Sequence, residues 1–239
     1  MSVTVGSARS SYGDTSAGDQ NGGKEVSTQS WYLHDKGWVV LRCKDAARRT
    51  LIAEAMRKAC DNNDIGYSQG SRDTLYSNIK GLGFDPSKTT KAVNTDCSAL
   101  VRVCCCYAGI KVGNFTTSSE KKTLMATGQF DCLTEDKYCK SSDYLMKGDI
   151  LVTKTKGHTV VVLTDGVKAE DVPTARTGDG TNAVTVSGNS VNVRYGPGTN
   201  YGIAKVVNKG DTLEKVEITG WTPVKVNGQV MYISVKFVK

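Results

Sequence analysis

Residues 171 to 183, "DVPTARTGDGTNA", divide the chain into a long part and a short part. This stretch has no apolar periodicity and is rich in Pro, Gly, Thr and Asp, a composition typical of linkers. The sequence before it is long enough to bury a core of its own, because domains usually run to about 100 to 200 residues. We therefore predict one domain over residues 1–170, a linker over residues 171–183 and a small domain over residues 184–239.

The first domain shows a pattern of helices followed by strands. Residues 45–62 begin with a capping Asp and place apolar residues on one helical face. A second helix is predicted from Cys97, where apolar side chains recur at helical spacing until Gly109. The stretch "GDILVTKTKGHTVVVLTDG" predicts two apolar strands and a closing Asp-Gly hairpin signal. Because residues 1–30 favour an irregular surface segment, the order of elements predicts an α+β fold.

The second domain alternates short β-rich runs with turns such as Gly196-Pro197-Gly198 and Asn227-Gly228. Short strands separated by frequent turn signals are typical of small all-β folds, and we predict a small β-barrel. Residues 184–239 hold seven Lys or Arg against three Asp or Glu, which is +4 of the chain's net charge of +7. This concentration of positive charge favours attraction to anionic polymers.

Composition excludes several classes of protein. No run of about 18 or more apolar residues suggests a membrane span, and no block of consecutive Lys or Arg suggests nucleic-acid binding. The N-terminal segment lacks the basic and apolar regions of a secretory signal, so we expect synthesis in the cytosol. Eight cysteines without evenly spaced pairs favour reduced thiols, and the absence of a C-x-x-C pair argues against zinc. We expect a monomer without metal or other cofactor.

Four of the eight cysteines lie within ten residues, in the stretch "NTDCSALVRVCCCYAG". Cys97 opens the predicted helix, with Thr95 and Asp96 as capping side chains, so unpaired N–H groups of the helix N-terminus point toward its sulfur. We expect this thiol to ionise more readily than a free thiol, whose pKa is about 8.5. The other cysteines have no activating neighbour, and those inside the helix are expected to pack in the core. Cys97 is the predicted nucleophile.

A thiolate nucleophile needs a base, and the chain has two histidines. His158 leads into the apolar run "TVVVL", where alternation would otherwise favour Val or Thr. His34 lies in the turn-like segment "YLHDKG", for which a solvated surface position is favoured. We predict His158 as the base, with a purely structural histidine at a strand edge as the alternative.

Three motifs in this order resemble the NlpC/p60 papain-like cysteine peptidases of bacterial cell-wall metabolism, to which the CHAP amidases are related. They are "TDCSALV" at Thr95–Val101, "KGDIL" at Lys147–Leu151 and "GHTVVV" at Gly157–Val162. The resemblance covers roughly residues 65 to 171. It implies a papain-like fold in which Cys97 is the nucleophile and His158 the base. Ala99 departs from the Gly that usually follows "DCS" in that family.

The resemblance also implies residues that bind the substrate. "IGYSQG" at Ile65–Gly70 is similar to the family's tyrosine motif, which would place Tyr67 beside the nucleophile as an oxyanion or substrate-binding donor. Asp96 and Ser98 would help to hold the substrate, in addition to capping the helix.

A third catalytic residue would orient the imidazole. By resemblance it would be Glu170, across a turn at Asp165-Gly166. The strand parity of an ideal two-residue hairpin favours Asp171 instead. A linker charge without any catalytic role is the remaining alternative.

Residues 184–239 closely resemble the bacterial SH3-like repeat, through "NVRYGPGTNY", "GWTPVKV" and "YISVKFV". The likeness implies a wall-binding module. Tyr195, Tyr201, Trp221 and Tyr232 could form its ligand groove.

Together the two resemblances imply an endolysin-like peptidoglycan hydrolase, made without a signal peptide and acting on the bacterial wall after release. It would cleave an amide of the stem peptide by a Cys/His mechanism, and its partners would be peptidoglycan and anionic wall polymers. Three alternatives remain: a non-catalytic wall-binding protein with a degenerate peptidase fold, a CHAP-type amidase that cuts the muramoyl amide, and a thiol amidase or transamidase that acts on a substrate other than the wall.

Overall fold

A computed structural model describes residues 2–10, 25–155, 157–169, 183–196, 198–199, 201–214, 221–226, 229–234 and 237. The chain divides into two compact units, Met1–Val172 and Pro173–Lys239. The architecture is mixed α/β with several separate sheets. Within the described ranges, no helix has the length and apolar character needed to cross a membrane.

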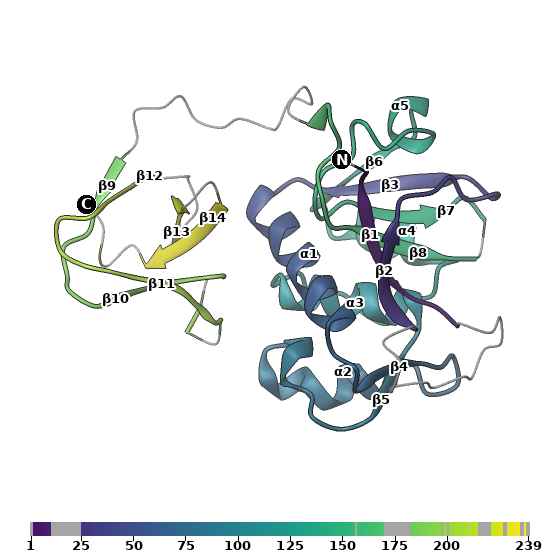
Figure 1. The fold of residues 1–239 in the computed structure, drawn as a ribbon, viewed down its shortest axis with the longest axis horizontal. Helices are drawn as coiled ribbons and strands as arrows, with labels where there is room; N and C mark the ends of the chain where they lie inside the picture. Colours follow the sequence, from purple (N-terminus) through teal and green to yellow (C-terminus); the bar gives the residue numbers. More distant parts are fainter. Residues whose placement is uncertain are drawn as a thin grey trace. The chain divides into compact units, whose positions relative to one another are not determined.

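A six-stranded sheet forms the centre of the first unit, in the order β2-β1-β8-β7-β3-β6 (Figure 1). All neighbouring strands are antiparallel, and the predicted β7/β8 pair is confirmed in the register Ile150↔Val161. The strands are β1 (Thr4–Ala8), β2 (Val26–Ser30), β3 (Trp38–Cys43), β6 (Phe130–Leu133), β7 (Ile150–Thr153) and β8 (Thr159–Val162).

The prediction of an irregular N-terminal segment is wrong, because β1 and β2 belong to this sheet. Strand β1 lies between β2 and β8, and its Val5 is fully buried. On the opposite face, a Cβ at Gly6 would come within 2.6 Å of Met56, so the missing side chain lets the helix pack closely. The sheet therefore combines strands from the beginning of the unit with strands that follow the helices, and it does not consist of the later strands alone.

Helices cover the sheet and carry the candidate site. They are α1 (Ala46–Cys60), α2 (Thr74–Ile79), α3 (Cys97–Tyr107), α4 (Glu120–Ala126) and α5 (Asp136–Cys139), with short 3-10 turns at Lys80–Leu82 and Pro86–Lys88. As predicted, Asp45 caps α1 by accepting hydrogen bonds from the N–H groups of Ala47 and Arg48. Helices α1 and α3 pack against each other and against the sheet (Figure 1). The start of α3 is thereby fixed beside β8.

A separate pair of parallel strands, β4 (Ile65–Tyr67) and β5 (Val93–Thr95), leads into α3. Its register sets Tyr67 opposite Thr95, two residues before Cys97. The pair therefore brings the tyrosine motif to the beginning of the helix.

The "KGDIL" motif has a structural role. Asp149 is fully buried, and its carboxylate accepts hydrogen bonds from Arg42 Nε at 2.8 Å and Nη2 at 2.6 Å. Gly148 has a φ of 87°, and a Cβ there would lie 2.0 Å from the carbonyl oxygen of Arg49. Only glycine fits this position, because both the positive φ and the close backbone exclude a side chain.

The predicted hairpin at Asp165-Gly166 is also wrong. The Asp165 carboxylate accepts from the N–H of Lys147 at 2.7 Å, and the N–H of Gly166 donates to the carbonyl of Leu145 at 2.9 Å. The chain after β8 thus packs against the loop before β7 instead of turning back as a strand. The strand-parity argument for Asp171 loses its basis.

The second unit has a four-stranded sheet, β11-β10-β14-β13, and a two-stranded sheet, β12-β9. Their bounds are β9 (Ala183–Thr185), β10 (Val191–Arg194), β11 (Ile203–Val207), β12 (Thr212–Glu214), β13 (Trp221–Val226) and β14 (Gln229–Ser234). Both sheets contribute buried apolar side chains to one core, among them Val193, Leu213 and Ile233. The strands described here do not close into a barrel, which differs from the prediction.

Candidate functional site

Cys97 is the first residue of α3, as predicted. Asp96 is the N-cap, with extended backbone, and its Oδ1 accepts a hydrogen bond from the N–H of Ala99 at 2.7 Å. The packing of α3 against β8 leaves Cys97 only 8% exposed. The sulfur therefore lies at a helix N-terminus but almost out of contact with water.

His158 immediately precedes β8, the strand against which α3 packs. The backbone N–H of Thr159, the residue that follows His158, lies near the Cys97 sulfur and favours its thiolate form. The His158 backbone is held by the Thr153 hydroxyl, which accepts from its N–H at 3.0 Å. No side chain in the described part of the chain forms a hydrogen bond with its half-buried imidazole ring. The starts of α3 and β8 thus lie close together, the roles of Cys97 and His158 stay predictions, and the described residues identify no third residue.

The predicted easy ionisation of Cys97 is wrong. Burial raises the pKa of the thiol to about 12, and the carboxylates of Asp96 and Glu120 add to the rise. The backbone N–H groups of Thr159 and Ser98 favour the thiolate, but their effect on the pKa is smaller than that of burial. Burial also lowers the pKa of His158 to about 4, aided by the charges of neighbouring side chains. At neutral pH the pair is an uncharged thiol and an uncharged imidazole.

Arg72 ties together the residues around the helix start. Its Nε donates to Asp96 Oδ2 at 2.5 Å, and its Nη2 donates to Asp96 Oδ1 at 3.1 Å and to the Ser98 hydroxyl at 2.8 Å. Ser98 in turn donates to Asp96 Oδ1 at 2.9 Å. Two planar, charge-assisted bonds make this pairing rigid. Asp96 and Ser98, predicted as substrate-binding residues, are thus engaged in a network that fixes the N-terminus of α3.

Tyr67 lies beside the helix start through the β4/β5 register, as the tyrosine motif implied. Its hydroxyl accepts a hydrogen bond from Gln69 Nε2 at 2.9 Å, and its backbone N–H donates to Glu25 Oε2 at 2.8 Å. The side chain is 7% exposed. The backbone of Tyr67 is therefore held near the start of α3 by its pairing with β5 and by the carboxylate of Glu25.

Glu120 is a fully buried carboxyl group close to the sulfur of Cys97. The Thr159 hydroxyl lies 2.7 Å from Glu120 Oε1 and 3.0 Å from the carbonyl oxygen of Leu151, and it has one proton for two acceptors. Glu120 Oε2 is moreover buried without a hydrogen-bond partner, so a carboxylate here would be poorly stabilised and the neutral acid is favoured. Burial raises the pKa of Glu120 to about 8, which agrees with this arrangement.

His34 lies closer to the candidate site than its turn-like sequence indicated. Its half-buried ring meets Trp38 at 5.2 Å and Tyr32 at 6.1 Å between centroids, and its Nδ1 accepts from the N–H of Lys36 at 3.1 Å. Its charge helps to lower the pKa of His158. The solvated position predicted for His34 is therefore only partly correct.

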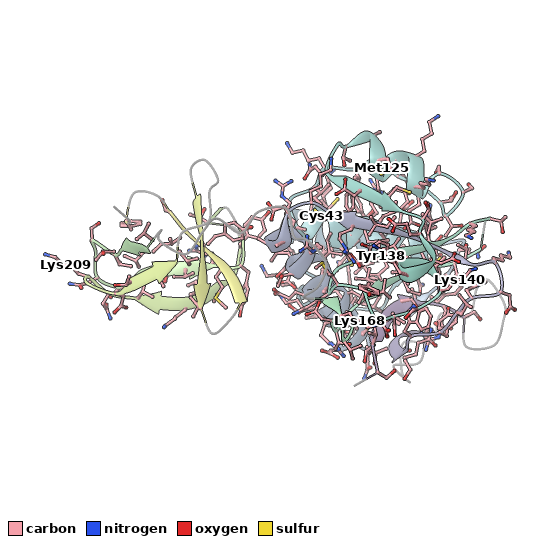
Figure 2. All side chains as sticks on the ribbon, turned by 90° about the horizontal axis from the view of Figure 1, so that it is seen from above. Cys43, Met125, Tyr138, Lys140, Lys168 and Lys209 are labelled. Carbon is pink, nitrogen blue, oxygen red and sulfur yellow. The ribbon has the colours of Figure 1, made fainter. Side chains whose placement is uncertain are left out.

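The remaining cysteines are packing residues. All eight are free thiols, and Cys43 (labelled in Figure 2), Cys104 and Cys105 are fully buried. Burial raises the pKa of the Cys104 and Cys105 thiols well above the ordinary value. In the described ranges, His, Cys, Asp and Glu form no cluster that could hold a metal ion.

Glu170 and Asp171, the two candidates for the third residue, lie outside the described residues. The catalytic role of Glu170 stays a prediction that rests on the family resemblance alone.

Arg72 and Glu120 are the residues that sequence reasoning missed. Arg72 lies 24 positions before its partner Asp96, in a turn-rich segment without periodicity. Glu120 stands in the first turn of a helix, where an exposed acid is the usual interpretation. No local signal distinguishes either residue, because their neighbours come from distant segments.

The fold and the site define a mixed α/β domain in which one cysteine opens a helix that packs against an inner strand of the sheet, and a histidine immediately precedes that strand. Residues 7–169 match the family model of the endolysin-like domain, so the chain belongs to this family. Membership indicates a cell-wall lytic function with peptidoglycan as the substrate. A comparison with curated proteins gave no match.

Proposed function

We propose that this chain is a peptidoglycan endopeptidase of papain-like type, which cleaves an amide of the stem peptide with Cys97 as nucleophile and acts on the wall after release from the cell. Membership of the endolysin-like family supports the substrate. The observation that supports the choice of mechanism is the position of the Cys97 sulfur at the start of α3, near the backbone of Thr159, the residue that follows His158.

Because thiol and imidazole are both neutral, proton transfer would accompany attack rather than precede it. His158 takes the proton of Cys97 as the sulfur adds to the amide carbonyl carbon. The Cys97 backbone N–H and Tyr67 would stabilise the resulting oxyanion. Collapse of this intermediate breaks the C–N bond, and His158 returns the proton to the leaving amine.

The resulting thioester would be hydrolysed by the reverse use of the same groups. A water molecule gives a proton to His158 and adds to the thioester carbonyl, after which the sulfur leaves and takes the proton back. Glu170 would orient the imidazole, and no cofactor enters the cycle. Asp96, Ser98 and Arg72 would hold the substrate side of the helix start in one geometry.

Residues 184–239 would bind the wall as an SH3-like module. The unit has a net positive charge, and β11 exposes Ile203 and Val206, each at 51%, on either side of Lys205. An apolar surface with a cation suits a polymer that has both sugars and anionic groups. Tyr232 is buried and does not belong to such a surface, whereas Tyr195 and Tyr201 are half-buried.

A second candidate is a wall-binding protein without catalytic activity. The raised pKa of Cys97 favours it, because a buried thiol with a pKa of about 12 is a poor nucleophile until a base takes its proton.

Clearing of a suspension of purified walls, with the release of free amino groups, separates the two. The wild type and the control C104A are expected to lyse walls, while C97A binds walls without lysing them. Binding without lysis by all three proteins would establish the non-catalytic function. Equal lysis by C97A and the wild type would refute the thiol mechanism.

A further inference from the structure

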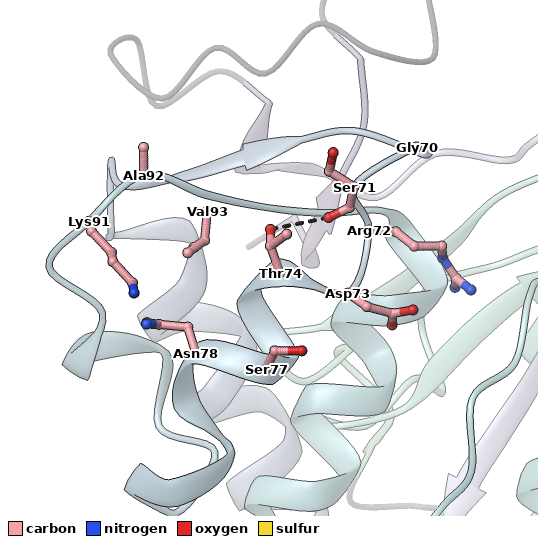
Figure 3. A pocket seen from close by; sticks show the side chains of 10 residues that line it. All are labelled: Gly70, Ser71, Arg72, Asp73, Thr74, Ser77, Asn78, Lys91, Ala92 and Val93. Carbon is pink, nitrogen blue, oxygen red and sulfur yellow. Dashed lines mark hydrogen bonds between the residues drawn. The ribbon is translucent and has the colours of Figure 1, made fainter.

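A pocket of about 650 Å³ opens next to the helix start, between α2 and the segment that leads into β5 (Figure 3). Residues 70–74 and 77–78 form one wall, and residues 91–93 form the other. Thr74 joins the two walls: its hydroxyl donates to the carbonyl oxygen of Asn94 at 3.0 Å and accepts from the N–H of Asn94 at 2.7 Å. These two hydrogen bonds hold the two walls of the pocket in a fixed position.

The charged groups of this pocket do not cancel. The guanidinium of Arg72 is occupied by Asp96. The carboxylate of Asp73 pairs with Arg102 at 3.5 Å and accepts from Asn114 at 3.1 Å. Lys91 lies on the opposite wall, and no carboxylate among the described residues pairs with its amine. One positive charge is left for a ligand.

A second donor points to the same place. Figure 3 shows the side-chain nitrogen of Asn78 and the amine of Lys91 directed toward each other across the pocket. Among the described residues the Asn78 side chain forms no hydrogen bond, and its Oδ1 atom is buried. Two converging donors, one of them cationic, suit an anionic acceptor with two oxygens, which is a carboxylate.

The pocket lies within reach of the reaction centre. Val93 lines the pocket and is four residues before Cys97. At about 3.3 Å per extended residue, the two are separated by roughly 13 Å at most. Lys91 is six residues before Cys97, roughly 20 Å away at most by the same measure, and an extended peptide covers that distance in about six residues, so a bound carboxylate would belong to the same short peptide as the scissile amide.

We propose that Lys91 and Asn78 form a subsite for a free carboxylate of the peptide substrate, within about six residues of the bond that is cut. This inference rests on the proposed peptidase function, because it assigns the pocket to the same substrate. It implies that the enzyme prefers stem peptides with a free carboxyl group at that distance over those in which the group is amidated or cross-linked.

The test uses the full chain with C97A and two synthetic stem peptides that differ only in a C-terminal carboxylate or amide. Isothermal titration should show the acid binding about tenfold more tightly than the amide, the size of one charge-assisted hydrogen bond at a partly exposed site. Adding K91M should abolish this preference, while adding K80M, which removes an exposed lysine outside the pocket, should keep it.

Equal binding of acid and amide, an unchanged preference in the K91M variant, or no binding of either peptide would overturn the subsite. These results are independent of catalysis, because all titrations use C97A. Failure of the proposed function would instead appear as an active C97A variant or an inactive wild type in the wall-clearing assay.

Discussion

Replacing Glu120 by Gln tests whether this buried side chain holds a proton in the folded protein. The carboxyl group is fully buried, and its pKa in the folded protein is about 8 against an ordinary value of 4.5. Below pH 4.5 both the folded and the unfolded chain hold the proton, and pH has no effect through this group. Between pH 4.5 and 8 only the unfolded chain releases it, so the free energy of unfolding falls as pH rises.

The size of this fall follows from the pKa. At 1.36 kcal/mol for each tenfold change in proton affinity, the wild type loses about 3 kcal/mol between pH 4.5 and pH 7, and about 4 kcal/mol by pH 8. The E120Q variant keeps a hydrogen-bonding group next to Thr159 but has no proton to release. The stability difference between the two proteins should therefore move by about 3 kcal/mol in favour of E120Q from pH 4.5 to pH 7.

Urea denaturation of the full chain at several pH values measures this difference. A constant offset from imperfect hydrogen bonding of the new amide does not affect the slope with pH. The control E135Q changes a side chain that is 65% exposed and should show no such slope. A difference between E120Q and the wild type that does not change with pH would refute the assignment of Glu120 as a protonated buried acid.

Other predictions follow from the same contacts. G148A should lower the free energy of unfolding by at least about 2 kcal/mol, because φ at this position is 87° and a Cβ would clash with the backbone of Arg49. G128A also has a positive φ but has open space around it, and it should lower the free energy of unfolding by about 1 kcal/mol. Equal losses of stability for the two variants in thermal unfolding would contradict this reasoning. Alkylation of Cys97 by iodoacetamide should rise about tenfold per pH unit up to pH 11, and a plateau below pH 9 would argue against its raised pKa. Wall lysis should persist at pH 5 and fall with a midpoint near pH 4, because His158 works as a base only when unprotonated; a midpoint near 6.5 would exclude its burial.

Local patterns were sufficient to predict the elements that carry the candidate pair. The cap at Asp96 and the apolar spacing after it predict the start and the buried face of α3. The two apolar runs on either side of Gly157 predict β7 and β8. Both signals lie within a few residues of the structure they specify, so neither requires knowledge of the rest of the fold.

The features that sequence reasoning missed depend on distant segments. Strand β1 has only Val5 and Ala8 as apolar markers, in a segment otherwise rich in small polar residues, and it becomes a strand because β2 and β8 pair with it. The pKa of Cys97 was predicted from the helix N-terminus, but burial between α3 and β8 has the larger effect. Burial is a property of the packed protein, and no spacing in the sequence reveals it.

Mass spectrometry of the muropeptides released from purified walls tests the central claim most directly. The wild type and C104A should give identical fragments with one new free amine in the stem peptide, and C97A should give none. Identical stem-peptide fragments from C97A and the wild type would contradict Cys97 as the nucleophile, and fragments cut only at the muramoyl amide would contradict the endopeptidase assignment.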